Sequence, residues 1–177
     1  RRGAEEDIPY FQHNFGKMYN YGEGVNQDFK EAVKWYLLAA DQGYANAQNN
    51  LGRLYEKGLG LEPDMKNAVR WYGKAAEQGL AQAQYNHGLL YKKGLGITRD
   101  MLKAVEFFQK AAEQGYAPAQ CSLGWMYACS QGVKQDFKEA VKWYRLSADQ
   151  GGADAQYNLG LMYANGQGVK QDFKEAE

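Results

Sequence analysis

The stretch AQYNLGLMY, residues 155–163, decides the fold because related stretches precede it four times at a fixed distance. AQCSLGWMY occupies 119–127, AQYNHGLLY 83–91, AQNNLGRLY 47–55 and FQHNFGKMY 11–19. Successive copies lie thirty-six residues apart, and no insertion breaks the register. A fixed period between about 20 and 50 residues is typical of solenoids, in which each unit buries its apolar face against its neighbours. The sequence therefore predicts an array of repeats.

The quoted stretch has the pattern of an amphipathic helix. In the second copy, Ala47, Leu51 and Tyr55 are spaced i, i+4, i+8 and form one apolar stripe. Gly52 recurs beside the stripe in every copy, although glycine inside a helix costs about 0.5–1 kcal/mol relative to alanine. This recurrence predicts a close approach by a neighbouring helix. Gly58 suits the left-handed end of the helix.

A second helix is predicted to begin at an aspartate that every copy contains. Aspartate is a favoured N-cap because its carboxylate accepts hydrogen bonds from free backbone N–H groups. Copies one, four and five add a glutamate three residues later, which is the pattern of a capping box. We therefore interpret the aspartates as caps rather than as catalysts or metal ligands. They are Asp28, Asp64, Asp100, Asp136 and Asp172, and the glutamates are Glu31, Glu139 and Glu175.

The apolar face of this second helix combines large rings with small residues. In copy two it consists of Ala68, Trp71, Tyr72, Ala75 and Ala76. The pattern predicts interdigitated packing between helices. The predicted fold class is thus an all-α solenoid of about five helix-turn-helix repeats. We expect residues 1–8 to be a leader or cap, followed by one domain over 9–177 with repeats at 9–44, 45–80, 81–116, 117–152 and a truncated 153–177.

Composition argues against several classes of function. The 177 residues carry 21 Lys and Arg against 21 Asp and Glu, with a pI near 6.9, so we expect no nucleic-acid partner. The apolar runs are far shorter than the roughly 20 residues that span a bilayer, so we expect no direct membrane insertion. Cys121 and Cys129 lie roughly 12 Å apart along one helix, too far for a disulfide. Neither His13 nor His87 stands at metal-ligand spacing from them.

Three motifs carry a resemblance to a known family: AQYNLGLMY (155–163), GQGVKQD (166–172) and AVKWYRLSADQG (140–151). They resemble the Sel-one-like repeat (SLR) family, over roughly residues 9–177. The resemblance implies a right-handed α/α superhelix related to tetratricopeptide repeats, and a scaffold for protein–protein contacts. Some secreted bacterial members hold each repeat with a cysteine pair, which this chain lacks. The near-identity of copies one, four and five resembles bacterial members, and the compartment stays open.

Departures from the repeat indicate where individual copies differ in structure or function. His87 stands where other copies have Phe15, Leu51, Leu123 and Leu159, and we expect it to be hydrogen-bonded or partly exposed, with a pH switch or ligand contact as the alternative. Ser130 replaces the first loop glycine, which predicts a strained or reshaped loop if that position has a positive φ. The last copy stops soon after its second helix should begin. We therefore expect an uncovered C-terminal apolar face and possible end-to-end association.

The predicted binding surface is the face of the first helices opposite the apolar stripe. At 100° per residue, positions 2, 5, 9, 12 and 13 of each copy point that way, and they also match the groove of tetratricopeptide-like repeats. Copies one and two supply a polar and basic set: His13, Lys17, Asn49, Arg53 and Lys57. Copies three to five supply an apolar set, Tyr85, Leu89, Cys121, Trp125, Tyr157 and Leu161, edged by Lys92 and Lys93. The flanking residues are Asn14, Asn50, Asn86, Ser122 and Asn158.

Two interpretations of this surface stay open at the level of sequence. The asparagines could bind a peptide backbone, or they could belong only to the repeat consensus, with Trp125 packing on the adjacent repeat. We predict a non-enzymatic scaffold that binds a protein or peptide partner in the groove, without cofactor, metal or catalytic residues. The alternatives are a structural spacer in a larger protein and, less favoured, a hydrolase.

Overall fold

The computed structural model describes residues 8–176, and these form an all-α, right-handed superhelical solenoid of paired helices. The first helices of the five copies are α2 (Ile8–Tyr21), α4 (Ala45–Lys57), α6 (Ala81–Lys93), α8 (Ala117–Ala128) and α10 (Ala153–Asn165). The second helices are α3 (Phe29–Asp41), α5 (Met65–Glu77), α7 (Met101–Glu113) and α9 (Phe137–Ala148). The predicted leader over residues 1–8 lies outside the described residues, except for Ile8.

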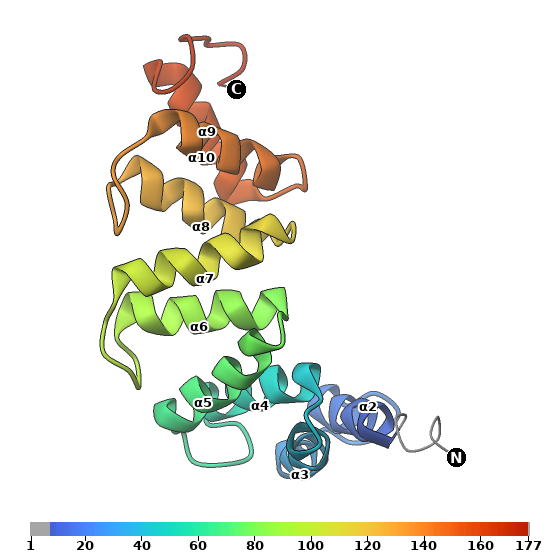
Figure 1. The fold of residues 1–177 in the computed structure, drawn as a ribbon. Helices are drawn as coiled ribbons and strands as arrows, with labels where there is room; N and C mark the ends of the chain where they lie inside the picture. Colours follow the sequence, from blue (N-terminus) through green and yellow to red (C-terminus); the bar gives the residue numbers. More distant parts are fainter. Residues whose placement is uncertain (1–7, 177) are drawn as a thin grey trace.

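The helices stack in the order of the sequence. Each packs mainly on the helices before and after it in the chain. Figure 1 shows α6 and α7 running across the view, whereas α2 and α3 are seen nearly end-on. The direction of the helices therefore rotates along the stack, as a superhelix requires.

The repeated aspartates cap the second helices, as predicted. The Asp136 carboxylate accepts hydrogen bonds from the N–H groups of Lys138 and Glu139, and Asp28 and Asp64 make equivalent pairs of bonds. Asp100 accepts one bond, from the N–H of Lys103. The predicted capping box was wrong. The N–H of Asp136, which a capping glutamate would need, donates instead to the carbonyl of Tyr127, and Glu139 pairs with Lys142. This aspartate-to-tyrosine backbone bond recurs in all five copies, so the loop geometry occupies the site that the box requires.

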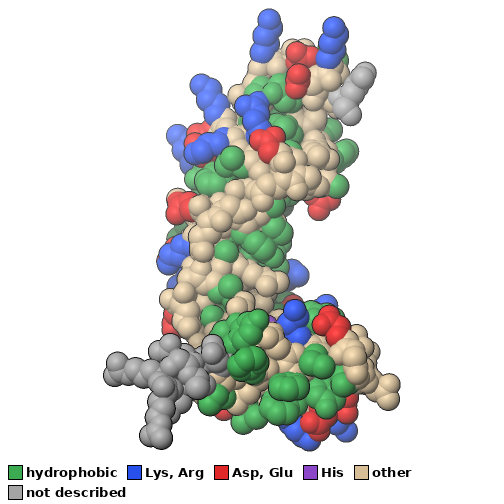
Figure 2. Space-filling model, turned by 90° about the vertical axis from the view of Figure 1, so that its right-hand side faces the viewer, with side chains coloured by type: hydrophobic (Ala, Val, Ile, Leu, Met, Phe, Trp, Pro, Cys, Tyr) green, Lys and Arg blue, Asp and Glu red, His purple; other side chains and the backbone are tan. Residues whose placement is uncertain are grey.

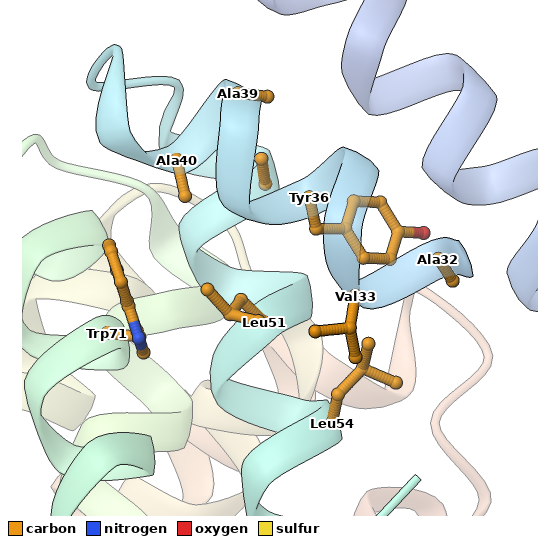
Figure 3. Close-up of a cluster of buried hydrophobic side chains, with 9 residues drawn as sticks. Ala32, Val33, Tyr36, Ala39, Ala40, Leu51, Leu54 and Trp71 are labelled. Carbon is orange, nitrogen blue, oxygen red and sulfur yellow. The ribbon is translucent and has the colours of Figure 1, made fainter. Parts of the chain in front are cut away.

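The glycine inside each of the first helices of copies one to four makes room for an aromatic ring, which confirms the predicted close approach there. A Cβ added at Gly124 would lie 2.8 Å from the Tyr144 ring of the same repeat. In copy two the ring is Tyr72, and in copy three it is Phe108. Some of these rings lie in clusters of buried residues that join neighbouring repeats. Figure 3 shows one such cluster, in which Tyr36 and Leu51 from copies one and two are buried together with Trp71.

A glutamine at the start of each first helix ties neighbouring repeats together. The side-chain amide of Gln84 donates to the carbonyl of Ala76 in the preceding repeat, at 3.3 Å. Its Oε1 accepts a bond of 2.7 Å from Gln114 at the end of its own repeat. Gln48 and Gln120 make the same two bonds and are buried. We call this series the glutamine ladder.

The C-terminal end of the solenoid has one helix fewer than the other repeats. Asp172 accepts bonds from the N–H groups of Lys174 and Glu175, yet residues 173–176 form turns and no second helix. On the apolar stripe of α10, Ala155 is buried, and Leu159 and Tyr163 are half-buried. Among the described residues, the face expected to be uncovered is therefore only partly exposed, although Phe173 is exposed.

Candidate functional site on the first helices

The candidate site is the surface of the first helices, which we define by two lines of residues. The inner line is His13, Asn49, Tyr85, Cys121 and Tyr157, and the outer line is Lys17, Arg53, Leu89, Trp125 and Leu161. We call the two lines together the first-helix surface. Figure 2 shows the molecule hollowed where the N-terminal repeats project beneath the stack, with hydrophobic side chains running up the middle of this view.

The first two residues of the inner line are used between repeats. His13 is buried between the rings of Tyr36 and Tyr44, and its Nε2 lies 3.1 Å from the amide of Asn50. Asn49 is 3% exposed, and its Oδ1 accepts a bond of 2.9 Å from Asn86. Burial, together with the nearby Lys17, lowers the pKa of His13. These two polar side chains therefore join consecutive first helices and present little surface to a partner.

The remaining inner-line residues become more accessible toward the C-terminus. Tyr85 is half-buried, with its ring 5.4 Å from that of Tyr116. Cys121 is half-buried, and both burial and the Asp154 carboxylate raise the pKa of its thiol. Tyr157 is 68% exposed. The apolar part of this line is therefore open mainly in copies four and five.

Trp125 is the largest partly exposed apolar group of the outer line. It is 36% exposed, and the Nζ of Lys92 lies 4.0 Å from its ring centroid, a cation–π contact. Partial burial and the adjacent Lys93 lower the pKa of Lys92. Between α8 and α10 the ring borders a hollow of about 340 Å³ that is also lined by Asn158 and Leu161. The Trp125 ring is thus accessible from solvent to a binding partner.

The basic residues of copies one and two lie at the other end of the surface. The guanidinium of Arg53 donates a bond of 3.2 Å to the Tyr21 hydroxyl and lies 5.7 Å from the centre of that ring. Lys57 is exposed, and Lys17 and Leu89 are half-buried. Within the first-helix surface, Arg53 and Lys57 therefore lie toward the N-terminal repeats, and the exposed Tyr157 and Leu161 lie toward the C-terminal repeats.

The flanking asparagines do not form one uniform row. Asn50 and Asn86 bond to the preceding first helix, as described above, so their amides are already engaged. Asn158 donates instead to the carbonyl of Asp154 within its own helix, at 2.7 Å. Asn14 and Ser122 are half-buried. Contacts between repeats thus account for two of these side chains.

The two unusual residues within the repeats have structural consequences. His87 is buried and stacks on Phe107 and Tyr91, with ring centroids 4.7 and 5.0 Å away. Within residues 8–176 neither ring nitrogen has a hydrogen-bond partner, so the expectation of a hydrogen-bonded or partly exposed histidine was wrong. Apolar rings and Gly73 enclose the imidazole. Burial, with a smaller effect of Lys103, lowers its pKa to about 4. Ser130 has a φ of 54°, which confirms the predicted strain.

The described residues offer little for metal chemistry or membrane insertion. Residues 8–176 contain no group of three or more His, Cys, Asp or Glu side chains that could hold a metal ion. Both cysteines are free thiols, consistent with their predicted separation. Among the described helices, none combines the length and apolar character needed to cross a membrane.

Comparison with known proteins identifies the repeat. The sequence matches the Sel1 repeat over residues 9–44, 45–80, 81–116, 117–152 and 153–177. No curated protein matches the chain. A protective antigen of uropathogenic Escherichia coli, solved with an SLR fold, is 41% identical with a TM-score of 0.91. The match covers 99% of this chain but only 38% of the antigen's chain.

Two further solved structures are similar to this chain. A Sel1 repeat protein from Oxalobacter formigenes is 39% identical with a TM-score of 0.88, and the match covers 97% of this chain and 70% of that one. Cysteine rich protein B of Helicobacter pylori has a similar fold at 22% identity, with a TM-score of 0.58 over 76% of this chain and 96% of that one. The repeat matches, which together span more than half of the sequence, show that the chain belongs to the Sel1 repeat family.

Proposed function

We propose that this chain is a non-enzymatic scaffold that binds a peptide or protein segment along the first-helix surface. The observation that carries the proposal is Trp125, which is partly exposed beside a hollow and held by Lys92. Tyr157 and Leu161 are exposed on the next first helix. An exposed aromatic cluster with a polar rim is typical of interaction sites, and tryptophan is among the residues that most often dominate their binding energy.

The charges suggest the polarity of the bound segment. Copies three to five offer apolar groups, so the segment should place its apolar anchors there. Arg53 and Lys57 lie toward the other end, so the segment should be acidic where it crosses copies one and two. Since His13 and Asn49 are buried, these two cations are the residues of that end which we expect to meet the partner.

Panning a phage-displayed library of random twelve-residue peptides against the folded chain tests the proposal. Selected peptides should combine an aromatic residue with acidic residues. Trp125→Ala should weaken their binding by about 30-fold, which corresponds to about 2 kcal/mol. Arg53→Glu should weaken it more at low salt than at high salt, because screening reduces the contribution of an exposed charge.

A matched control comes from the opposite side of the repeats. Lys138 is exposed near the start of α9, so Lys138→Glu changes charge by the same amount away from the first helices. It should leave peptide affinity unchanged. If both site variants keep their melting curves and bind the selected peptides as tightly as the wild type, the assignment of the surface fails. If panning selects no peptides, the result would instead favour the alternative that the chain is a structural spacer.

A further inference from the structure

The residue just before each first helix differs at the last junction. Tyr44, Leu80 and Tyr116 precede α4, α6 and α8, whereas Gly152 precedes α10. Tyr44 lies against the inner-line residue His13, with ring centroids 5.1 Å apart. At the third junction Tyr116 lies against Tyr85 in the same way. At the fourth junction the inner-line residue is Cys121, and no side chain from position 152 covers it.

The backbone at Gly152 does not require glycine. Its φ and ψ are −68° and 103°, against −69° and 108° for Tyr44 and −71° and 103° for Tyr116. The N–H of each of these residues also donates to the same carbonyl of the preceding second helix, at 3.0–3.1 Å. A side chain at position 152 would therefore leave the backbone in the direction that the two tyrosines take.

Ser147 accompanies the glycine. The equivalent residues in the first three copies are alanines, Ala39, Ala75 and Ala111. The Ser147 hydroxyl donates a bond of 2.9 Å to the carbonyl of Ala117. Its Oγ lies 2.8 Å from where a Cβ of residue 152 would be placed. The two departures are thus coupled, because the serine occupies space that a side chain at 152 would need.

The missing side chain leaves a hollow of about 300 Å³ between α8 and α10, within the lower range of ligand sites. Tyr85, Pro118 and Cys121 are among its walls, and Asp154 stands at the α10 side. The Asp154 carboxylate helps to raise the pKa of the Cys121 thiol, so its negative charge lies close to the hollow. The position of Asp154 is occupied in the other copies by Tyr10, Asn46, Gln82 and Pro118, so only this junction carries an acid there.

We propose that this hollow, the 152 pocket, binds an aromatic side chain of the partner segment that lies next to a cationic group. Tyrosine fills the equivalent place at two other junctions, which favours an aromatic ring as the occupant. The Asp154 carboxylate at the edge of the hollow favours a cation beside that ring. This inference rests on the proposed scaffold function and adds one specific anchor point to it.

Nuclear magnetic resonance titration with p-cresol, the side-chain analogue of tyrosine, tests the ring site without any partner. The wild type should bind with a dissociation constant of about 1 mM, the range expected of so small a ligand, with shifts centred on the amides of Cys121, Ser122 and Ala153. Ser147→Ala combined with Gly152→Tyr supplies the ring from the chain and should abolish these shifts. Ser147→Ala alone removes only one hydroxyl from the wall of the pocket and should still show these shifts, which separates the effect of the added ring from the loss of the serine.

Tyramine, which adds an ammonium group to the phenol ring, tests the cationic preference. It should bind two- to five-fold more tightly than p-cresol at low salt, the size of an exposed ion pair. In Asp154→Asn the two ligands should bind equally. Equal binding in the wild type would overturn the cationic part of the inference.

If p-cresol causes no shifts around Cys121 in the wild type, the proposed ring site is wrong. This result holds even if the double variant with Gly152→Tyr fails to fold. The peptides selected against the chain separate this inference from the proposed function. If Trp125→Ala weakens their binding but the folded double variant does not, the scaffold function stands and the 152 pocket is not used. If neither change matters while p-cresol binds, the scaffold function fails and the pocket remains a ligand site.

Discussion

At the scale of the residue, His87 links stability to pH. Its pKa is about 4 in the folded chain, against an ordinary value of 6.5, so the unfolded chain takes up a proton first as the pH falls. The stability associated with the neutral ring is therefore complete above pH 6.5 and is lost between pH 6.5 and 4, by up to about 3 kcal/mol. Urea unfolding at several pH values measures this loss.

His87→Leu isolates the effect, since leucine occupies this position in three other copies. At pH 7 the free energy of unfolding of the variant should be higher by about 1–3 kcal/mol, because two buried nitrogens without partners are removed. The variant should therefore unfold at a higher urea concentration. Its free energy of unfolding should also fall much less than that of the wild type between pH 6.5 and 4. His13, whose pKa is also lowered, remains in both proteins and accounts for what is left. An unchanged pH profile would contradict this assignment.

Ser130 stores backbone strain that a single substitution removes. Its φ of 54° lies in the left-handed region, which costs a residue with a Cβ roughly 1–2 kcal/mol. Ser130→Gly should therefore raise the free energy of unfolding by about 1 kcal/mol. The reverse change at the equivalent Gly166, with a φ of 63°, should lower it by a similar amount. Equal melting temperatures for all three proteins would show that the loop relaxes.

At the scale of the element, the helix glycines separate packing from helix propensity. Gly124→Ala places a Cβ 2.8 Å from the Tyr144 ring, so we expect a loss of about 1–3 kcal/mol as α8 and α9 move apart. At the equivalent Gly160 a Cβ would meet no ring, only the carbonyl of Ala176 at 2.9 Å. Gly160→Ala should therefore cost less than Gly124→Ala, because only this one backbone carbonyl must shift and alanine favours the helix by about 1 kcal/mol. Chemical denaturation of both variants makes the comparison.

The helices and their caps were predictable because they depend on local spacing. The aspartates, the helix glycines and the apolar stripes each act within one repeat, and the sequence presents them five times. The engagement of His13 and Asn49 was not predictable, since it depends on side chains thirty-seven residues away on the next first helix. Helical phase places a residue on a face, but it does not tell how closely the neighbouring helix covers that face.

His87 and Gly152 were recognisable as departures from the repeat, but the sequence did not give their surroundings. The alignment of copies identified His87 as unusual, but its environment depends on Gly73, Phe107 and Tyr91, which come from three different helices. The substitution at Gly152 was visible in the repeat pattern and could have been noticed beside Ser147. Its meaning required the dihedral angles and the hollow that the structure supplies.

At the scale of the whole molecule, the C-terminal end should respond to a cover. Appending a helix with the sequence of residues 137–148 after Glu177, joined by a short turn, should bury part of the α10 face. We expect a higher melting temperature and less self-association, because stability in solenoids grows with each interface between neighbours. Sedimentation velocity and thermal unfolding measure the two effects. A control appendage with its apolar residues replaced by serine should change neither.

The glutamine ladder makes the repeats exchangeable units. Each ladder amide depends only on a carbonyl and a glutamine that every complete repeat supplies, so removing or adding one whole repeat leaves no ladder group unpaired. The array can therefore lengthen or shorten in steps of thirty-six residues while its junctions keep the same bonds. The asparagine contacts and the 152 pocket do not have this freedom, because each belongs to one junction. The bonds of the glutamine ladder are thus the same whatever the order of the copies, whereas the surface proposed to bind a partner depends on that order.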